Sequence, residues 1–326
     1  MRRILPIFFL LVVLPAWGQV EYELMKPLAP ARLSDYTLHA CELRGPVRSS
    51  TYRYFEANYV NGRIEKGSEA ENPEIKYDYY TTFTKRGFVE SVIDLRDLQG
   101  TINFKDSLLF NAEGMPIRMT RYFRDGRVKF YESFEYTHGK MTRWAAHRQE
   151  HIQNDLVCTY SADGNILSEL ETDFYYPEPY DMHSMADDTQ NRVLAQRYYH
   201  YDEQGRLHKR ISGEFQTEYF YSVEGKPVKR SSRNEGDEWA TWEISGDSLI
   251  YRELTSNGNS HVHLTHFNPQ GDPVEKRFYA NGTLTRRETY MYVYDEQGNW
   301  ISRCFGSFDC AYPTYWCDER VITYHE

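Results

Sequence analysis

The sequence predicts an all-β protein, a long meander of antiparallel β-hairpins in one sheet, and two observations lead to this fold class. The first is an internal repeat: an aromatic residue is followed three or four positions later by Gly and then by an apolar residue, in twelve copies between residues 59 and 300. The second is that helical periodicity is weak after the N-terminal residues, whereas apolar and polar residues alternate between the turns. Repeated turns separated by alternating segments are typical of an antiparallel meander.

Two near-identical segments, Tyr201–Leu207 and Tyr294–Trp300, show how a repeat folds. Both begin Tyr-Asp-Glu-Gln-Gly. Asp-Glu-Gln-Gly fits a type I turn whose last residue has φ > 0, a conformation that Gly adopts at little cost. The first aromatic residue of each segment then lies opposite its last apolar residue, and such pairs stabilise a sheet by roughly 0.2–1 kcal/mol each. We expect both pairs on the same, more buried face.

The copies differ in the length of the turn. The short form predicts two-residue type I′ turns, at Gly62, Gly126, Gly139 and Gly282. The longer form occurs at Gly87, Gly114, Gly164, Gly205, Gly225, Gly246, Gly271 and Gly298. In four of these copies the apolar residue comes one position later, and in three it follows Pro116, Pro227 or Pro273. Because Pro cannot donate to a central ladder, we expect slightly longer loops there.

Between the repeats, return turns are expected in polar or Gly-containing segments. They are Ser68–Pro73, Leu98–Thr101, Gln153–Asp155, Gly213, Asn234–Asp237 and Ser256–Asn259. Together the turns divide the chain into on the order of 20 strands, whereas open twisted sheets rarely exceed about ten. The sheet is therefore expected to coil into a spiral shell or to form a strongly twisted, elongated sheet.

The N-terminal residues have the pattern of an export signal. Arg2 and Arg3 precede an apolar run, and Ala16-Trp17-Gly18 has the form of a cleavage site, so residues 1–18 are expected to be removed. No segment is long and apolar enough for a transmembrane helix. We expect an N-terminal segment at 19–49 and a repeat domain at 50–326, with a loop insertion at 175–190. The location expected is the periplasm, the cell surface or the extracellular space.

Composition restricts the class of partner. The formal net charge of −10 disfavours a nucleic acid, which requires a basic face. The chain contains 28 Tyr, and its mean hydropathy is −0.73. Because Tyr favours strands and tolerates a half-wet surface, these values indicate a sheet with much of its area near water.

Five cysteines in an exported chain permit disulfides and leave at least one thiol outside an intramolecular pair. Opposing Cys304 and Cys317 encloses a loop of twelve residues, which stabilises by roughly 3 kcal/mol in the chain-entropy model. This register also puts Trp300 opposite Val321 on the apolar side. The alternatives are a bond from Cys310 to either neighbour, or three free thiols.

The segment Tyr201-Asp-Glu-Gln-Gly-Arg-Leu207 resembles the YD repeat of Rhs-type secreted proteins, and Tyr294–Trp300 resembles it with Asn-Trp in place of Arg-Leu. The short copies, such as Phe278–Leu284, are similar to variant MORN repeats of bacterial envelope proteins. The similarity of pattern covers about residues 50–325. It implies hairpins wound into a shell, and it brings no catalytic residues to this chain.

No motif predicts a catalytic centre, a metal site or a cofactor. His147 and His151 match the spacing of a metalloprotease motif, but that motif requires a helix, and this segment is expected to be strand. His261 and His263 share a face on a strand but lack a third ligand. In the insertion, Asp181, Asp187 and Asp188 lack the spacing of a calcium loop.

The sequence favours a non-enzymatic exported protein that binds a protein or glycan partner in the cell envelope. Loops that interrupt a repeat often carry function. In the insertion, Tyr175, Tyr176 and Tyr180 offer rigid contact area for such a partner. The alternative is a hydrolase or other enzyme that uses carboxylates of the insertion, such as Glu178 or Asp181. A purely structural envelope role is a third hypothesis.

Overall fold

The computed structural model describes residues 36–38, 40–70, 78–94, 104–148, 151–174, 192–234, 237–255, 257–309 and 313–326. This part of the chain forms twenty-one β-strands and contains no α-helix. The strands are β1 (Val47–Val60), β2 (Arg63–Glu69), β3 (Tyr79–Phe83), β4 (Val89–Asp94), β5 (Phe104–Phe110), β6 (Pro116–Phe123), β7 (Val128–Thr137), β8 (Lys140–Arg148), β9 (His151–Tyr160), β10 (Ile166–Asp173), β11 (Arg192–Tyr201), β12 (Leu207–Ser212), β13 (Phe215–Tyr221), β14 (Pro227–Asn234), β15 (Asp237–Ser245), β16 (Ser248–Leu254), β17 (Ser260–Phe267), β18 (Pro273–Ala280), β19 (Thr283–Tyr294), β20 (Trp300–Asp309) and β21 (Thr314–Tyr324).

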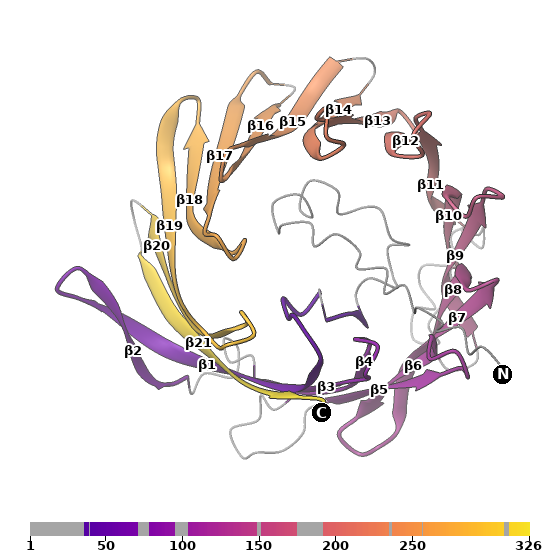
Figure 1. Ribbon diagram of the computed structural model, residues 1–326, viewed down its shortest axis with the longest axis horizontal. Helices are drawn as coiled ribbons and strands as arrows, with labels where there is room; N and C mark the ends of the chain where they lie inside the picture. The colour runs from indigo at the N-terminus through magenta and orange to yellow at the C-terminus, as the bar shows by residue number, and fades with distance from the viewer. Residues whose placement is uncertain are drawn as a thin grey trace, which may run out of the picture.

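The sheet closes into an antiparallel barrel. From β3 onward each strand pairs with the next. β21 then pairs with β1, and β1 pairs with β3. Twenty strands therefore make the ring, while β2 pairs with the far end of β1 and projects from it (Figure 1). The expectation of a coiled or twisted meander is correct for the antiparallel order but wrong for the shape, because pairing β1 with β21 leaves no free edge in the ring.

The repeat glycines lie at the turns, as predicted. All twelve have positive φ, between 61° and 85°. In three of the four short copies the residue before Gly also has positive φ, as a type I′ turn requires: Asn61, His138 and Asn281. The fourth, at Gly126, was predicted wrongly. Its N–H donates to the Phe123 carbonyl oxygen (2.9 Å), and Val128 pairs with Tyr122 instead of Phe123.

The copies with Pro do not have longer loops. Pro116, Pro227 and Pro273 themselves pair with the repeat aromatic residue, in the position that Leu207 occupies in its own repeat. Each is the first residue of a strand and adjoins a register shift, where Pro is compatible with a ladder. The turn at Gly246 is shorter than predicted: Ser245 pairs with Ser248.

The predicted return turns have mixed outcomes. Gly213 lies between β12 and β13, and Asn234 at the end of β14 pairs with Asp237 at the start of β15. The described residues of Ser256–Asn259 lie between β16 and β17. The prediction at Gln153–Asp155 is wrong, because these residues lie within β9 and Asp155 pairs with Ala145 of β8. Leu98–Thr101 lies outside the described residues, as does part of Ser68–Pro73.

The hydrophobic core lines the inner face of the barrel. The segment that precedes β1 lies inside the ring (Figure 1). Leu43 of this segment belongs to the core, and Leu38 packs against it. The other buried core residues include Phe83, Met119, Trp144, Leu156, Leu207 and Tyr219. They share the inner face with buried ion pairs such as Asp106–Arg121 (2.6 Å). Tyr294 pairs with Trp300 and Tyr201 with Leu207 on this face, as predicted.

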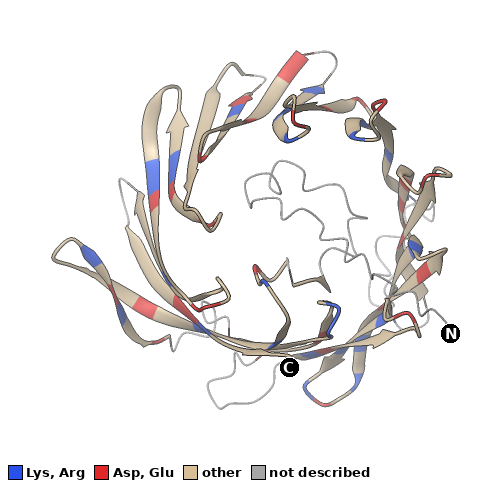
Figure 2. Ribbon diagram, in the orientation of Figure 1, with Lys and Arg blue, Asp and Glu red and all other residues tan. Residues whose placement is uncertain are grey.

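The outer face is mixed and largely exposed. Apolar residues there include Leu109, Val157, Val193, Met291 and Val293. Between them lie cross-strand ion pairs, namely Arg143–Asp155 (2.8 Å), Arg252–Glu243 (3.3 Å) and Arg287–Glu275 (2.6 Å). Figure 2 shows residues of both charge signs interspersed around the ring.

Cys304 and Cys317 form a disulfide with Cα atoms 4.1 Å apart, and they pair between β20 and β21. The expected burial of Trp300 and Val321 on one side is wrong. Trp300 is 1% exposed and faces inward, whereas Val321 is 64% exposed. The reason is a register shift beside the repeat turn, which changes the side to which Trp300 points.

Candidate functional site

Four rings stand side by side on the inner face across β15–β18, and we call them the aromatic row: Trp242, Tyr251, His263 and Phe278. Their successive centroid separations are 4.9, 5.0 and 4.8 Å. These values match the spacing of adjacent strands, because each ring lies directly opposite the next.

A guanidinium covers each end of the aromatic row. Arg230 of β14 stacks on Trp242 at 3.8 Å from the ring centroid, and Arg286 of β19 stacks on Phe278 at 3.9 Å. These positions are also set by cross-strand register. Cation–π contacts of this kind hold the end rings in place.

Two open hollows flank the aromatic row. One, of about 300 Å³, has Leu249, Thr265 and Lys276 beside the rings, and the other, of about 400 Å³, has His261 and Arg286. Burial lowers the pKa of His263, so its imidazole is neutral at pH 7. The row thus combines half-buried rings with hydrogen-bonding groups, the combination that binds an elongated polar molecule with apolar faces.

A second site lies where the barrel closes, and we call it the seam pocket. It has a volume of about 660 Å³ between β20, β21, β1, β3, β4 and the segment before β1. Apolar and aromatic side chains form most of its wall, among them Leu43, Tyr54, Tyr79, Phe83 and Trp316. Its walls also include the two guanidinium groups of Arg303 and Arg320.

The two arginines of the seam pocket differ in their partners. Arg303 donates to the fully buried Asp318 carboxylate at 2.7 Å, and although burial opposes it, that carboxylate raises the pKa of Arg303. Arg320 is 7% exposed and donates to the carbonyl oxygens of Cys41 and Glu42 (3.1 and 3.2 Å). Burial lowers the pKa of Arg320 to about 10, and the Glu42 carboxylate offsets part of this effect.

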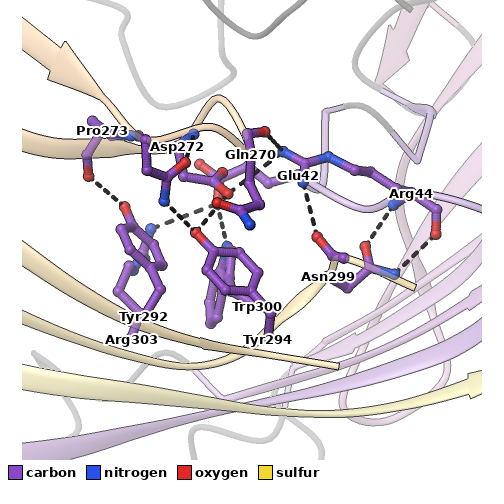
Figure 3. Close-up of polar contacts among 12 residues, drawn as sticks. Glu42, Arg44, Gln270, Asp272, Pro273, Tyr292, Tyr294, Asn299, Trp300 and Arg303 are labelled. Atoms are coloured by element: carbon purple, nitrogen blue, oxygen red, sulfur yellow. Dashed lines mark hydrogen bonds and ion pairs between the residues drawn. The ribbon is translucent and has the colours of Figure 1, made fainter. Parts of the chain in front are cut away.

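Residues 40–46 directly precede β1, and we call them the N-terminal clasp. The clasp contacts two repeat turns, those that contain Gln270 and Gly298 (Figure 3). The Arg44 guanidinium donates to the carbonyl oxygens of Gly298 (2.8 Å) and Gln270 (2.6 Å). Asn299, 1% exposed, exchanges two hydrogen bonds with the Arg44 backbone (2.6 and 2.9 Å). The Glu42 carboxylate accepts from Trp300 Nε1 at 3.3 Å. Cys41 and Leu43 of the clasp line the seam pocket, so the clasp forms one of its walls.

The predicted ligand-binding residues Tyr175, Tyr176 and Tyr180, with the whole insertion at 175–190, lie outside the described residues, as does Cys310. His147 and His151 lie on different strands, β8 and β9. Within the part of the chain that the structure describes, no group of three or more metal-ligating side chains occurs. Among the same residues, no helix is long and apolar enough to cross a membrane.

Sequence reasoning identified one member of the aromatic row only. It placed His261 and His263 on one face, and both lie on the inner face. The row was missed because the copy at Gly246 was predicted to have the longer turn, whereas Ser245 pairs with Ser248 and the register therefore places Trp242 opposite Tyr251. The signal that could have identified the row is the segment Ser-Gly-Asp-Ser at 245–248, which forms a two-residue turn. The seam pocket joins residues from both ends of the chain and has no local signal.

Comparisons with known proteins identify no family. No family model matches the chain, and no curated protein does. Among solved structures, a porin-like protein from Bacteroides uniformis is 8% identical, with 86% of this chain and 98% of that chain covered and a TM-score of 0.36. A porin-like protein from Bacteroides vulgatus is 10% identical over the same shares, at a TM-score of 0.26. The TcdB2-TccC3-Cdc42 structure is 12% identical, with 70% of this chain but 17% of that chain covered, at 0.21. At such scores these likenesses carry no argument about function.

Proposed function

We propose that the protein is an exported, non-enzymatic binding protein of the cell envelope that holds a glycan partner along the aromatic row. The observation that carries this proposal is the continuous strip of four inward-facing rings, each about 5 Å from the next. A strip of rigid rings offers contact area at little cost in side-chain entropy. Sugars present apolar C–H faces to such rings and hydroxyl groups to polar neighbours.

Polar groups beside the aromatic row suit such a ligand. Lys276 and Thr265 line the hollow of about 300 Å³ together with Trp242 and Tyr251. Each can hydrogen-bond a hydroxyl group. A few polar groups placed among apolar walls are what orients a ligand in most binding sites.

Two features support placement outside the cytoplasm. The first residues have the composition of an export signal, and disulfides such as Cys304–Cys317 persist in oxidising compartments.

The ion pairs on the outer face, such as Arg287–Glu275 (2.6 Å), fit contact with water. An Arg or Lys that faces lipid at the middle of a bilayer costs about 2–4 kcal/mol.

We also propose that the repeats are related to YD-type hairpin repeats. The support is local: Gly205 and Gly298 have the positive φ that the Tyr-Asp-x-x-Gly turn requires. In both copies the Asp side chain accepts from backbone N–H groups of its own turn, as Asp202 does from Arg206 at 2.8 Å and Asp295 from Asn299 at 2.9 Å.

The proposed function is tested by glycan-array screening followed by calorimetry of the best glycan. Trp242→Ala and Phe278→Leu are expected to weaken binding by roughly tenfold or more, since stacked rings dominate such contacts. The matched control is Tyr198→Ala on the outer face, where Tyr198 is 44% exposed, and it should bind normally. If the protein binds a polypeptide but no glycan of the array, the partner is a polypeptide and the proposal is contradicted.

A further inference from the structure

The seam pocket has the features of a small-molecule site that is separate from the aromatic row. We propose that it binds an acidic amphiphile, a molecule with an apolar body and one anionic head group, and that this head group takes the place of Glu42 against Arg320. The row is formed by β15–β18, whereas the pocket is formed by β20, β21, β1, β3, β4 and the clasp. The inference therefore does not depend on the glycan proposal.

The apolar body is accommodated by the wall of the pocket. Leu43, Phe83 and Val92 line it together with the rings of Tyr54 and Trp316. The volume of about 660 Å³ lies within the usual range for small-molecule sites. A ligand with an alkyl or similar chain would cover this apolar surface and remove it from water.

Arg320 supplies the reason for an anionic head group. Its guanidinium is 7% exposed and lies 3.4 Å from the centroid of the Trp300 ring. The Glu42 carboxylate is its nearest anionic partner, at 3.4 Å. Arg303, in contrast, is already engaged by Asp318 at 2.7 Å. A guanidinium binds carboxylate or phosphate in a bidentate arrangement, so Arg320 is the expected anchor.

Glu42 is held in a way that allows its replacement. Its side chain is 46% exposed, and its contacts with Trp300, Arg320 and Arg303 are 3.3, 3.4 and 3.5 Å. Its backbone φ is +54°, which is uncommon for a residue other than Gly. Glu42 and Asp318 balance the two arginines, so a head group that displaces Glu42 leaves the local charge balanced. Figure 3 shows Glu42 with two of these partners, Trp300 and Arg303.

The experiment uses three probes with the same chain: dodecanoate, dodecyl phosphate and dodecanol, below their micelle concentrations, measured by calorimetry and tryptophan fluorescence. Saturable binding of one or both anions, with the alcohol roughly tenfold weaker or more, is the expected result. The two anions distinguish a carboxylate head group from a phosphate. Equal binding of acid and alcohol, or no saturable binding, overturns the proposal.

Two variants locate the head group. Glu42→Gln removes the competing carboxylate and should tighten binding of the anionic probe several-fold, and Arg320→Gln should weaken it by roughly tenfold. The control is Glu319→Gln, because Glu319 pairs with Lys66 away from the pocket. Should Arg320→Gln fail to fold, Glu42→Gln still decides the question, since unchanged or weaker binding in that variant contradicts the displacement of Glu42.

Discussion

The central carbon of the Arg320 guanidinium lies 3.4 Å from the centroid of the Trp300 ring. Arg303 lies over the same ring at 4.5 Å, and Trp300 itself is 1% exposed. Cation–π contacts between desolvated groups contribute about 2 kcal/mol or more. This stack joins the last two strands of the ring to the clasp, because Glu42 contacts the indole N–H and both arginines.

Trp300→Ala is expected to destabilise the protein by about 3–5 kcal/mol, the usual cost of removing a large buried aromatic side chain. Urea unfolding, followed by circular dichroism, measures the change. Val321→Ala is the control, since Val321 is 64% exposed on a neighbouring strand and its loss should stay within about 0.5 kcal/mol. Equal effects of the two substitutions would contradict the inward orientation of Trp300.

Gly205→Ala should destabilise by about 1–2 kcal/mol, although there is room for the methyl group. No atom lies within 4 Å of a Cβ added at Gly205, so the cost comes from its φ of +75° alone. Gly205→Asn is the matched variant, because Asn tolerates positive φ, and it should cost less than Ala. Thermal melting of both proteins decides the order, and a larger loss with Asn would show that the turn is not limited by backbone conformation.

Reduction of the disulfide between Cys304 and Cys317 is expected to lower the free energy of unfolding by roughly 3 kcal/mol. The double variant with Ser at both positions should show the same loss without reductant. Peptide mapping of the exported protein under non-reducing conditions identifies the bond. A linkage that includes Cys310 would contradict the assignment.

The thiols of Cys41 and Cys158 should react slowly in the native protein. Burial raises the pKa of Cys41 to about 11 and that of Cys158 to about 12. The reactive thiolate is therefore scarce at pH 8, in contrast to a free thiol with its usual pKa of about 8.5. Alkylation with iodoacetamide, measured by mass spectrometry with and without urea, tests this. Rapid native labelling of Cys158 would argue against its burial.

Stability is expected to decrease as the pH falls below about 6.5, partly because of His263. Burial lowers the pKa of its imidazole in the folded state, so the unfolded chain takes up the proton first. The contribution is fully present above the unfolded pKa and is lost as the pH falls toward the folded pKa. His263→Phe should flatten this part of the profile. Denaturant unfolding between pH 5 and 7.5 measures the slope, and an unchanged slope in the variant would assign it to other groups.

Turn positions and hairpin partners were predictable because they depend on neighbouring residues. Gly205 and Gly298 occupy a conformation that few other residues adopt. Each ends a turn that begins at an aromatic residue, and this turn sets the local register. The same rule placed Tyr294 opposite Trp300. Prediction failed where one residue changes the turn, as at Gly126, because a slip of a single position alters every pair that follows.

A chain of antiparallel hairpins with one aromatic face follows from local patterns, since turn chemistry and alternation act over a few residues. Closure of the sheet does not follow from such patterns, because it pairs Thr51 with Val321 across almost the whole chain. That pairing depends on the summed twist and register shifts of all the strands between them, which no local pattern records. The seam pocket and its Arg320–Trp300 stack exist only because the two ends meet there.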